Sequence, residues 1–181
     1  NDRWAVVMGN GYNSTNEKPV LLIQYVDGDK ALVKIMPATC ASGTCQGDGN
    51  GLSAPRLLDL NGDGKVDIAY AGDLKGNLWK FDLTNPSPSS WGVAFGGAPC
   101  FVAVNPSGAR QSITTAPYTM SHPGGGIMLA FGTGRNVTTT DPAATATETM
   151  WGIHDNSTII LTTSPISFTE TGTDLGKAPR G

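Results

Sequence analysis

Residues 58–83 read LDLNGDGKVDIAYAGDLKGNLWKFDL, and this stretch decides the fold. It contains two short, mainly apolar runs, 66–71 and 78–81. A third apolar run, the two leucines 57–58, precedes them. Short runs that are rich in β-branched and aromatic residues and bounded by Gly, Asn and Asp predict strands. The segment between the first two predicted strands, 59–67, is polar and carries Asp or Asn at its first, third, fifth and ninth positions.

This polar segment has the spacing of a calcium-binding loop. Ca²⁺ prefers about six to eight oxygen ligands, and a short loop supplies them by curling so that alternate side chains point inward. The predicted ligands are Asp59, Asn61, Asp63, the main-chain carbonyl of Lys65, and Asp67. Gly64 falls at position 6, where such loops turn sharply. The alternative is a solvated Asn-Gly/Asp-Gly turn, which does not require the last carboxylate, that of Asp67.

The loop differs from calcium sites of the helix-loop-helix type. Position 12 is Tyr70, where a bidentate Glu would be expected, and both flanks read as strands. We therefore expect the ion to hold two strand ends together. Because three carboxylates in so short a loop repel one another without a cation, the predicted role of Ca²⁺ is structural.

A pattern of apolar strand, glycine, polar turn and second strand occurs three times. The aligned glycines are Gly9, Gly72 and Gly132, at spacings of 63 and 60 residues. A further strand-like run follows in each repeat, and these runs are 31–36, 91–95 and 158–162. Self-similarity at about 60 residues, with about four strands per unit, predicts the blades of a β-propeller. The strand before each aligned glycine is expected to be an inner strand that is buried on both faces, with the glycine allowing close backbone approach.

The sequence thus predicts an all-β protein, a partial β-propeller of about three four-stranded antiparallel blades with the calcium loop between strands. The blade-like units are 1–52, 53–110 and 111–181, all within one domain. Because propellers typically have about four to eight blades, we expect the chain to be part of a longer polypeptide. Its end blades would expose apolar faces and favour self-association. Trp79 and Trp151 occupy matching positions and are expected in the core between blades.

Bulk composition argues against several classes of function. The net charge is -3 and charged residues make up 15%, so nothing suggests nucleic-acid binding. No apolar run reaches the length of about 18 residues that indicates a transmembrane segment. His122 and His154 have no evident partner and no catalytic set emerges, which predicts a non-enzymatic protein. The segment 141–150 is the only candidate for a helical turn, with Pro142 at its first position.

The three cysteines have different predicted roles. Cys40 and Cys45 are separated by a flexible Ala-Ser-Gly-Thr spacer and are expected to form a disulfide in an oxidising compartment. A Cys-x4-Cys metal site is the alternative, although no second ligand pair stands nearby. Cys100 is expected to be buried and inert, or to pair with a residue elsewhere.

The stretch 58–83 resembles the calcium-loop blade of the PilY1/PilC family of type IV pilus proteins. The segments 131–135 (FGTGR) and 150–155 (MWGIHD) resemble the next blade of that family. The resemblance implies a modified propeller in the C-terminal part of a large secreted adhesin, with the family's calcium ligands falling on the five residues named above. It also implies that calcium modulates pilus extension, retraction and surface attachment.

The partners implied by the resemblance belong to the full-length protein. They are the minor pilins at the pilus tip and a host or abiotic surface. The implied location is extracytoplasmic, at the bacterial cell surface or pilus tip, the outer membrane or the periplasm. Two alternatives stay open at this point: an integrin-like calcium-binding propeller of another secreted adhesion protein, and a fragment of a quinoprotein-type dehydrogenase.

Overall fold

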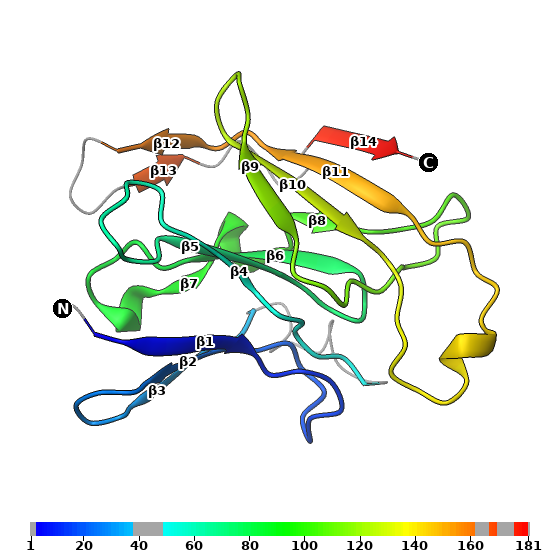
Figure 1. Ribbon diagram of the computed structural model, residues 1–181, viewed down its shortest axis with the longest axis horizontal. Coiled ribbons are helices and arrows are strands. Elements are labelled where there is room, and N and C mark those ends of the chain that lie inside the picture. The colour runs from blue at the N-terminus through cyan, green and yellow to red at the C-terminus, as the bar shows by residue number, and fades with distance from the viewer. Residues whose placement is uncertain (1–2, 38–48, 162–166, 170–175, 181) are drawn as a thin grey trace.

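The computed structural model describes residues 3–37 and 49–161, together with the backbone of residues 167–169 and 176–180. These residues form three antiparallel sheets and one separate hairpin, and the sheets stack as layers (Figure 1). The all-β prediction is therefore confirmed. Within the described ranges, no helix has the length and apolar character needed to cross a membrane.

The first sheet has three strands in the order β1-β2-β3 and forms the lowest layer in Figure 1. The strands are β1 (Ala5–Gly9), β2 (Leu21–Tyr25) and β3 (Leu32–Ile35). Along β2, buried and half-buried positions alternate. This period of two is that of a strand with one face against the core.

The second sheet is the middle layer and follows the path β4-β5-β6-β7, with β8 also pairing with β6. The strands are β4 (Arg56–Leu58), β5 (Ile68–Gly72), β6 (Asn77–Asp82), β7 (Gly92–Val93) and β8 (Phe101–Val102). Two short 3-10 helices, η1 (Pro88–Ser90) and η2 (Phe95–Gly97), flank β7. The predicted run 91–95 is thus only two residues long as a strand, because the chain turns at Phe95, which has a φ of 54°.

The third sheet has the order β14-β11-β10-β9. The strands are β9 (Tyr118–Ser121), β10 (Ile127–Gly132), β11 (Met150–Asp155) and β14 (Gly176–Arg180). The candidate helical turn in 141–150 is the short 3-10 helix η3 (Asp141–Ala143), with a proline at its start as predicted.

The prediction that 158–162 forms the fourth strand of this sheet is wrong. The strand β12 (Thr158–Ile160) pairs instead with β13 (Ser167–Thr169), and β14 takes the place beside β11. The chain leaves the sheet after Asp155 because its carboxylate accepts a hydrogen bond of 3.0 Å from the amide of Ser157 and forms a local turn.

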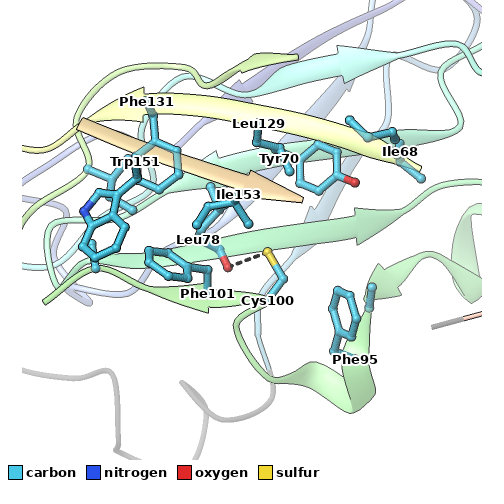
Figure 2. Packing of buried hydrophobic residues seen from close by; sticks show 14 residues of the cluster. Ile68, Tyr70, Leu78, Phe95, Cys100, Phe101, Leu129, Phe131, Trp151 and Ile153 are labelled. Carbon is cyan, nitrogen blue, oxygen red and sulfur yellow. Dashed lines mark hydrogen bonds between the residues drawn. The ribbon is translucent and has the colours of Figure 1, made fainter. Parts of the chain in front are cut away.

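Two apolar clusters fill the spaces between the layers, one on each face of the second sheet. Along β5 and β6, Ala69, Ala71 and Trp79 face the first sheet, whereas Tyr70 and Leu78 face the third. Figure 2 shows the cluster between the second and third sheets, where Tyr70 and Leu78 lie close to Leu129 and Ile153 of the third sheet. Successive side chains of a strand point to opposite faces of its sheet. Because apolar residues of β5 and β6 point both ways, both faces of this sheet carry apolar side chains.

The two predicted tryptophans lie in these inter-sheet cores, which confirms their assignment. Trp79 is fully buried between the first and second sheets. Trp151 is 6% exposed and packs between the second and third, where its ring meets Phe101 edge-on at 4.9 Å.

Burial on both faces holds only for the middle layer, so that prediction is wrong for the two outer sheets. All five residues of β5 are buried. In contrast, Val6 and Met8 on β1 are 48% and 39% exposed, and Ala130 on β10 is exposed. Moreover, β5 and β10, the strands before Gly72 and Gly132, each have a neighbour on both edges. β5 lies between β4 and β6, and β10 lies between β9 and β11.

Candidate metal centre

The predicted calcium loop joins β4 to β5 as a hairpin connection. Leu58 and Ile68 are the last paired residues at its base. The prediction that strands, not helices, flank this loop is therefore confirmed. Gly62 and Gly64 have φ angles of 78° and 84°, so the tight curvature relies on residues without a side-chain penalty at positive φ.

Asp59 organises the first half of the loop through its carboxylate. Its Oδ1 accepts hydrogen bonds from the amides of Gly62 at 2.7 Å and Asp63 at 3.2 Å, and its Oδ2 accepts one from Gly64 at 2.8 Å. These amides, above all that of Gly64, lower the pKa of Asp59. The carboxylate is therefore held charged at neutral pH.

Asn61 and Asp63 form two further local turns. The Asn61 Oδ1 accepts a hydrogen bond of 2.9 Å from the amide of Asp63, and the Asp63 Oδ1 accepts one of 2.9 Å from the amide of Lys65. Each side chain thus bonds the amide two residues ahead, the arrangement by which Asx residues bend a chain.

Asp67 closes the loop and, unlike the other ligand candidates, is buried, at 6% exposed. Its Oδ2 accepts a hydrogen bond of 2.6 Å from the amide of Leu60. Burial raises the pKa of Asp67, and the charges of Asp63 and Asp59 raise it further, against the lowering effect of the Leu60 amide. The main chain of Asp67 also bonds Leu58 and Leu83, each at 2.9 Å. The residue therefore anchors the loop to both neighbouring strands.

The donor set fits a hard cation. All the candidate ligands offer oxygen, which suits Ca²⁺ and not a metal that prefers sulfur or nitrogen. In the described residues, no three His, Cys, Asp or Glu side chains already converge on a common point. Asp63 bonds loop amides through Oδ1 and Asp67 through Oδ2. Each of these carboxylates uses one of its two oxygens in these bonds, and the calcium site stays a prediction.

A buried polar cluster next to the loop was not predicted from the sequence. Lys80 on β6 places its Nζ 2.8 Å from Oδ2 of Asp155 at the end of β11, and both side chains are at most 2% exposed. Tyr70 donates a hydrogen bond of 2.5 Å to the same Oδ2, and Ser157 donates one of 2.5 Å to Oδ1. A lysine inside the apolar strand Leu78–Asp82 was the available sequence signal.

The charge state of this cluster follows from competing effects. Burial by itself would raise the pKa of Asp155, but the charge of Lys80 and the hydrogen bonds from Lys80, Ser157 and Tyr70 lower it overall. Burial and the neighbouring Asp155 charge raise the pKa of Tyr70 well above its usual value. The pair is thus a salt bridge that joins the second sheet to the third.

The remaining sequence-based candidates have clear positions. The two histidines contact each other, with the ring centroids of His122 and His154 4.0 Å apart, a pairing that was not predicted from the sequence. Cys100 is fully buried, as one of the two predicted possibilities had it, and its Sγ donates to the carbonyl of Leu78 at 3.1 Å (Figure 2). Cys40 and Cys45 lie outside the described residues.

Comparison with known proteins places the chain in a family. A family model described as the PilY1 beta-propeller domain matches residues 1–175. The type IV pilus biogenesis factor PilY1 of Pseudomonas aeruginosa strain PAO1 is 42% identical over 177 residues, covering 87% of this chain and 15% of that protein. A PilY1 homolog of Xylella fastidiosa strain Temecula1 is 37% identical over 174 residues, covering 89% of this chain and 12% of that protein.

A solved structure shows the same similarity in three dimensions. The crystal structure of the Pseudomonas aeruginosa PilY1 C-terminal domain matches with a TM-score of 0.72 and 41% sequence identity, covering 84% of this chain and 34% of that chain. The chain therefore spans about a third of that structure and 12–15% of these two curated relatives. From the family match, the sequence identity and the shared fold together, the chain belongs to the PilY1 β-propeller domain family.

Proposed function

We propose that this chain is a calcium-binding propeller region of a type IV pilus biogenesis factor that acts as an adhesin at the pilus tip. The observation that carries the calcium part is the β4–β5 loop, where three Asp carboxylates lie within nine residues of one hairpin connection. The raised pKa of Asp67, caused by burial and by the neighbouring carboxylates, supports this proposal, because a bound cation would offset the repulsion between these carboxylates.

The residues that would hold Ca²⁺ are the side chains of Asp59, Asn61, Asp63 and Asp67 and the carbonyl of Lys65. When bound, the ion supplies positive charge that offsets the mutual repulsion of the three carboxylates. Asp67 then transmits this stabilisation to the hairpin, because its main chain bonds Leu58 and Leu83. The proposed role of the site is to fix the β4–β5 corner and hence the second sheet.

The pilus part of the proposal comes from the relatives, which are named type IV pilus biogenesis factors and not enzymes. We propose a non-catalytic role, outside the cytoplasm at the cell surface or pilus tip. In the whole protein, the proposed partners are minor pilins and a host or abiotic surface, and calcium modulates pilus extension and retraction. The three sheets are proposed to be three blade-like units, 1–52, 53–110 and 111–181.

Isothermal titration calorimetry with CaCl₂ tests the site on the purified chain. Asp59→Ala and Asp63→Ala are expected to abolish or strongly weaken the binding heat. Asn105→Ala is the matched control, since Asn105 likewise caps an exposed turn, through hydrogen bonds of 3.1 Å and 2.8 Å from the amides of Ser107 and Ala109, outside the loop. Equal heats for the parent and Asp63→Ala would remove Asp63 from the site.

The pilus role needs the intact gene. Cells that carry Asp59→Ala in the full-length protein are expected to show altered twitching motility and surface piliation, while Asn105→Ala cells behave as the parent does. Unchanged motility and piliation in the Asp59→Ala cells, at normal protein levels, would contradict a role for calcium in pilus dynamics.

A further inference from the structure

A narrow crevice separates the calcium loop from the third sheet. It is too narrow to hold a water molecule. Leu60 and Ile68 line it from the loop and β5, Lys80 lines it from β6, and Asp155 and Ile159 line it from the opposite side. The crevice therefore lies directly between the loop and the buried salt bridge.

Leu60 contacts both the predicted ligand set and the apolar cluster between the second and third sheets. Its amide donates the 2.6 Å hydrogen bond to Asp67, the buried member of the predicted ligand set. Its side chain is half-buried and, together with Ile159 of β12, packs against the apolar cluster between the second and third sheets. In the loop it stands between the first two predicted ligands, Asp59 and Asn61. A backbone movement of Asp59 or Asn61 toward an ion would therefore also move Leu60.

Lys80 and Asp155, next to Leu60 in the crevice, are sensitive to water. Their attraction is strong because both are buried, and it weakens where water raises the local dielectric. Asp155 also bonds Ser157, which leads into β12. Loosening the salt bridge would thus loosen the chain segment that connects β11 to the β12–β13 hairpin.

We propose that Leu60 couples the calcium loop to the seam between the second and third sheets, by which we mean the Lys80–Asp155 salt bridge and the crevice beside it. With the loop ligated, the Leu60 side chain is held over the crevice and excludes water from the Lys80–Asp155 salt bridge. With the loop unligated, Leu60 moves more freely, water reaches the salt bridge, and β11 and β12 become more mobile. This inference rests on the proposed calcium site and assigns to that site a regulated element, 150–160, that lies 90–100 residues after Leu60 in the sequence.

The proposal has a thermodynamic corollary. If calcium favours the closed seam by some factor, a closed seam must favour calcium by the same factor, because coupling between two sites is reciprocal. Weakening the seam should therefore weaken calcium binding as long as Leu60 connects the two. Without Leu60, the two properties should become independent.

Hydrogen exchange of the whole 181-residue chain, followed by mass spectrometry, tests the coupling. In the parent, calcium is expected to slow amide exchange in 150–160 by about fivefold or more. In Leu60→Ala this protection is expected to be lost, and Leu60→Met should restore most of it. Leu57→Ala is the matched control, because Leu57 lies near the same loop but packs against the cluster facing the first sheet.

The outcomes separate the coupling from the site itself. If calorimetry shows no calcium binding by the parent, the proposed site fails and the coupling falls with it. If calcium binds but does not slow exchange in 150–160, the coupling alone is overturned. It is overturned equally if Leu60→Ala keeps the full calcium-dependent protection.

A milder change in the seam gives a second, independent measurement. Tyr70→Phe removes one hydrogen bond to Asp155 and leaves both charges in place. It is expected to lower calcium affinity severalfold when Leu60 is present, and to have no effect in the Leu60→Ala background. An equal loss of affinity in both backgrounds would contradict transmission through Leu60.

Discussion

Lys80 and Asp155, which are 75 residues apart in the sequence, form a 2.8 Å salt bridge between the second and third sheets, with side chains 2% and 0% exposed. Both side chains are buried, so each charge depends on the other: Asp155 also accepts hydrogen bonds from Tyr70 and Ser157, and Lys80 donates one to the Ser157 hydroxyl. This relationship has a direct consequence for stability.

Removing one partner of this salt bridge should be strongly destabilising. Lys80→Met is expected to lower the free energy of unfolding by roughly 3–5 kcal/mol, because it leaves the Asp155 carboxylate buried without a counter-charge. Urea denaturation followed by tryptophan fluorescence measures the change. The double variant Lys80→Met/Asp155→Leu should recover much of the loss, since both buried charges are then absent.

Arg3→Met is the control for this experiment. Arg3 pairs with Asp27 and Asp29 at the surface, where water screens ion pairs and their contribution is small. Its effect should be far smaller than that of Lys80→Met. Similar losses for the two variants would mean that burial of the Lys80 salt bridge does not determine its contribution.

The pH dependence of calcium binding should follow Asp67. Its pKa is raised, mainly by burial and then by Asp63 and Asp59, so the folded state favours its neutral form. Without calcium, protonation of Asp67 is therefore expected to increase the free energy of unfolding as the pH falls through this raised pKa toward the unfolded value of about 3.9. Calcium affinity should fall over the same pH range, because protons compete for the carboxylate.

Asp67→Asn isolates this contribution from that of Asp73, another carboxylate whose pKa is raised by burial. The difference in unfolding free energy between the parent and the variant, measured without calcium from neutral pH down to about pH 4, should shrink as the pH falls. A difference that is constant with pH would show that Asp67 does not titrate in this way.

The three aligned glycines should differ in their tolerance of a side chain. A Cβ at Gly9 would lie 2.1 Å from the carbonyl oxygen of Ser53, and one at Gly72 would lie 2.2 Å from Cγ2 of Ile113. At Gly132, nothing in the described residues lies within 4 Å of that position. Gly9→Ala and Gly72→Ala are therefore expected to destabilise by about 1–3 kcal/mol, and Gly132→Ala by less than about 0.5 kcal/mol.

Thermal unfolding of the three variants measures this order. The expectation of close approach at each aligned glycine thus holds for Gly9 and Gly72 and is wrong for Gly132, because that position lies on the same face of β10 as the exposed Ala130, where the described part of the chain places no covering layer. A loss at Gly132→Ala equal to that at Gly72→Ala would contradict this explanation.

The open outer faces should cause self-association of the 181-residue chain. On the third sheet, Tyr118, Met120 and Met150 are 61%, 54% and 59% exposed, an unusual density of large apolar side chains on one surface. Sedimentation velocity at increasing protein concentration is expected to show oligomers. Met120→Lys should reduce them, whereas Val137→Lys, which changes an exposed apolar residue in a connecting loop, should not.

Local sequence was sufficient to predict the β4–β5 hairpin and its loop. The loop ligand candidates lie within nine residues, and short apolar runs bounded by turn residues identified the strands, so no long-range information was needed. The fourth strand of the third sheet was mispredicted because the turn at Asp155 directs the chain out of the sheet. A distant segment, β14, pairs there instead, and strand propensity does not specify which edge a strand joins.

The sequence alone determined the all-β class, and it predicted three repeats and a set of oxygen ligands, because short apolar runs, turn residues and ligand spacing are local properties. Only the tertiary structure decided that Lys80 meets Asp155, that His122 meets His154, and that Leu60 of the loop packs against the cluster between the second and third sheets. These contacts join residues far apart in the chain, and their positions follow from how the sheets stack. Burial, which raises the pKa of Asp67, is likewise a property of the stacked layers and not of any one segment.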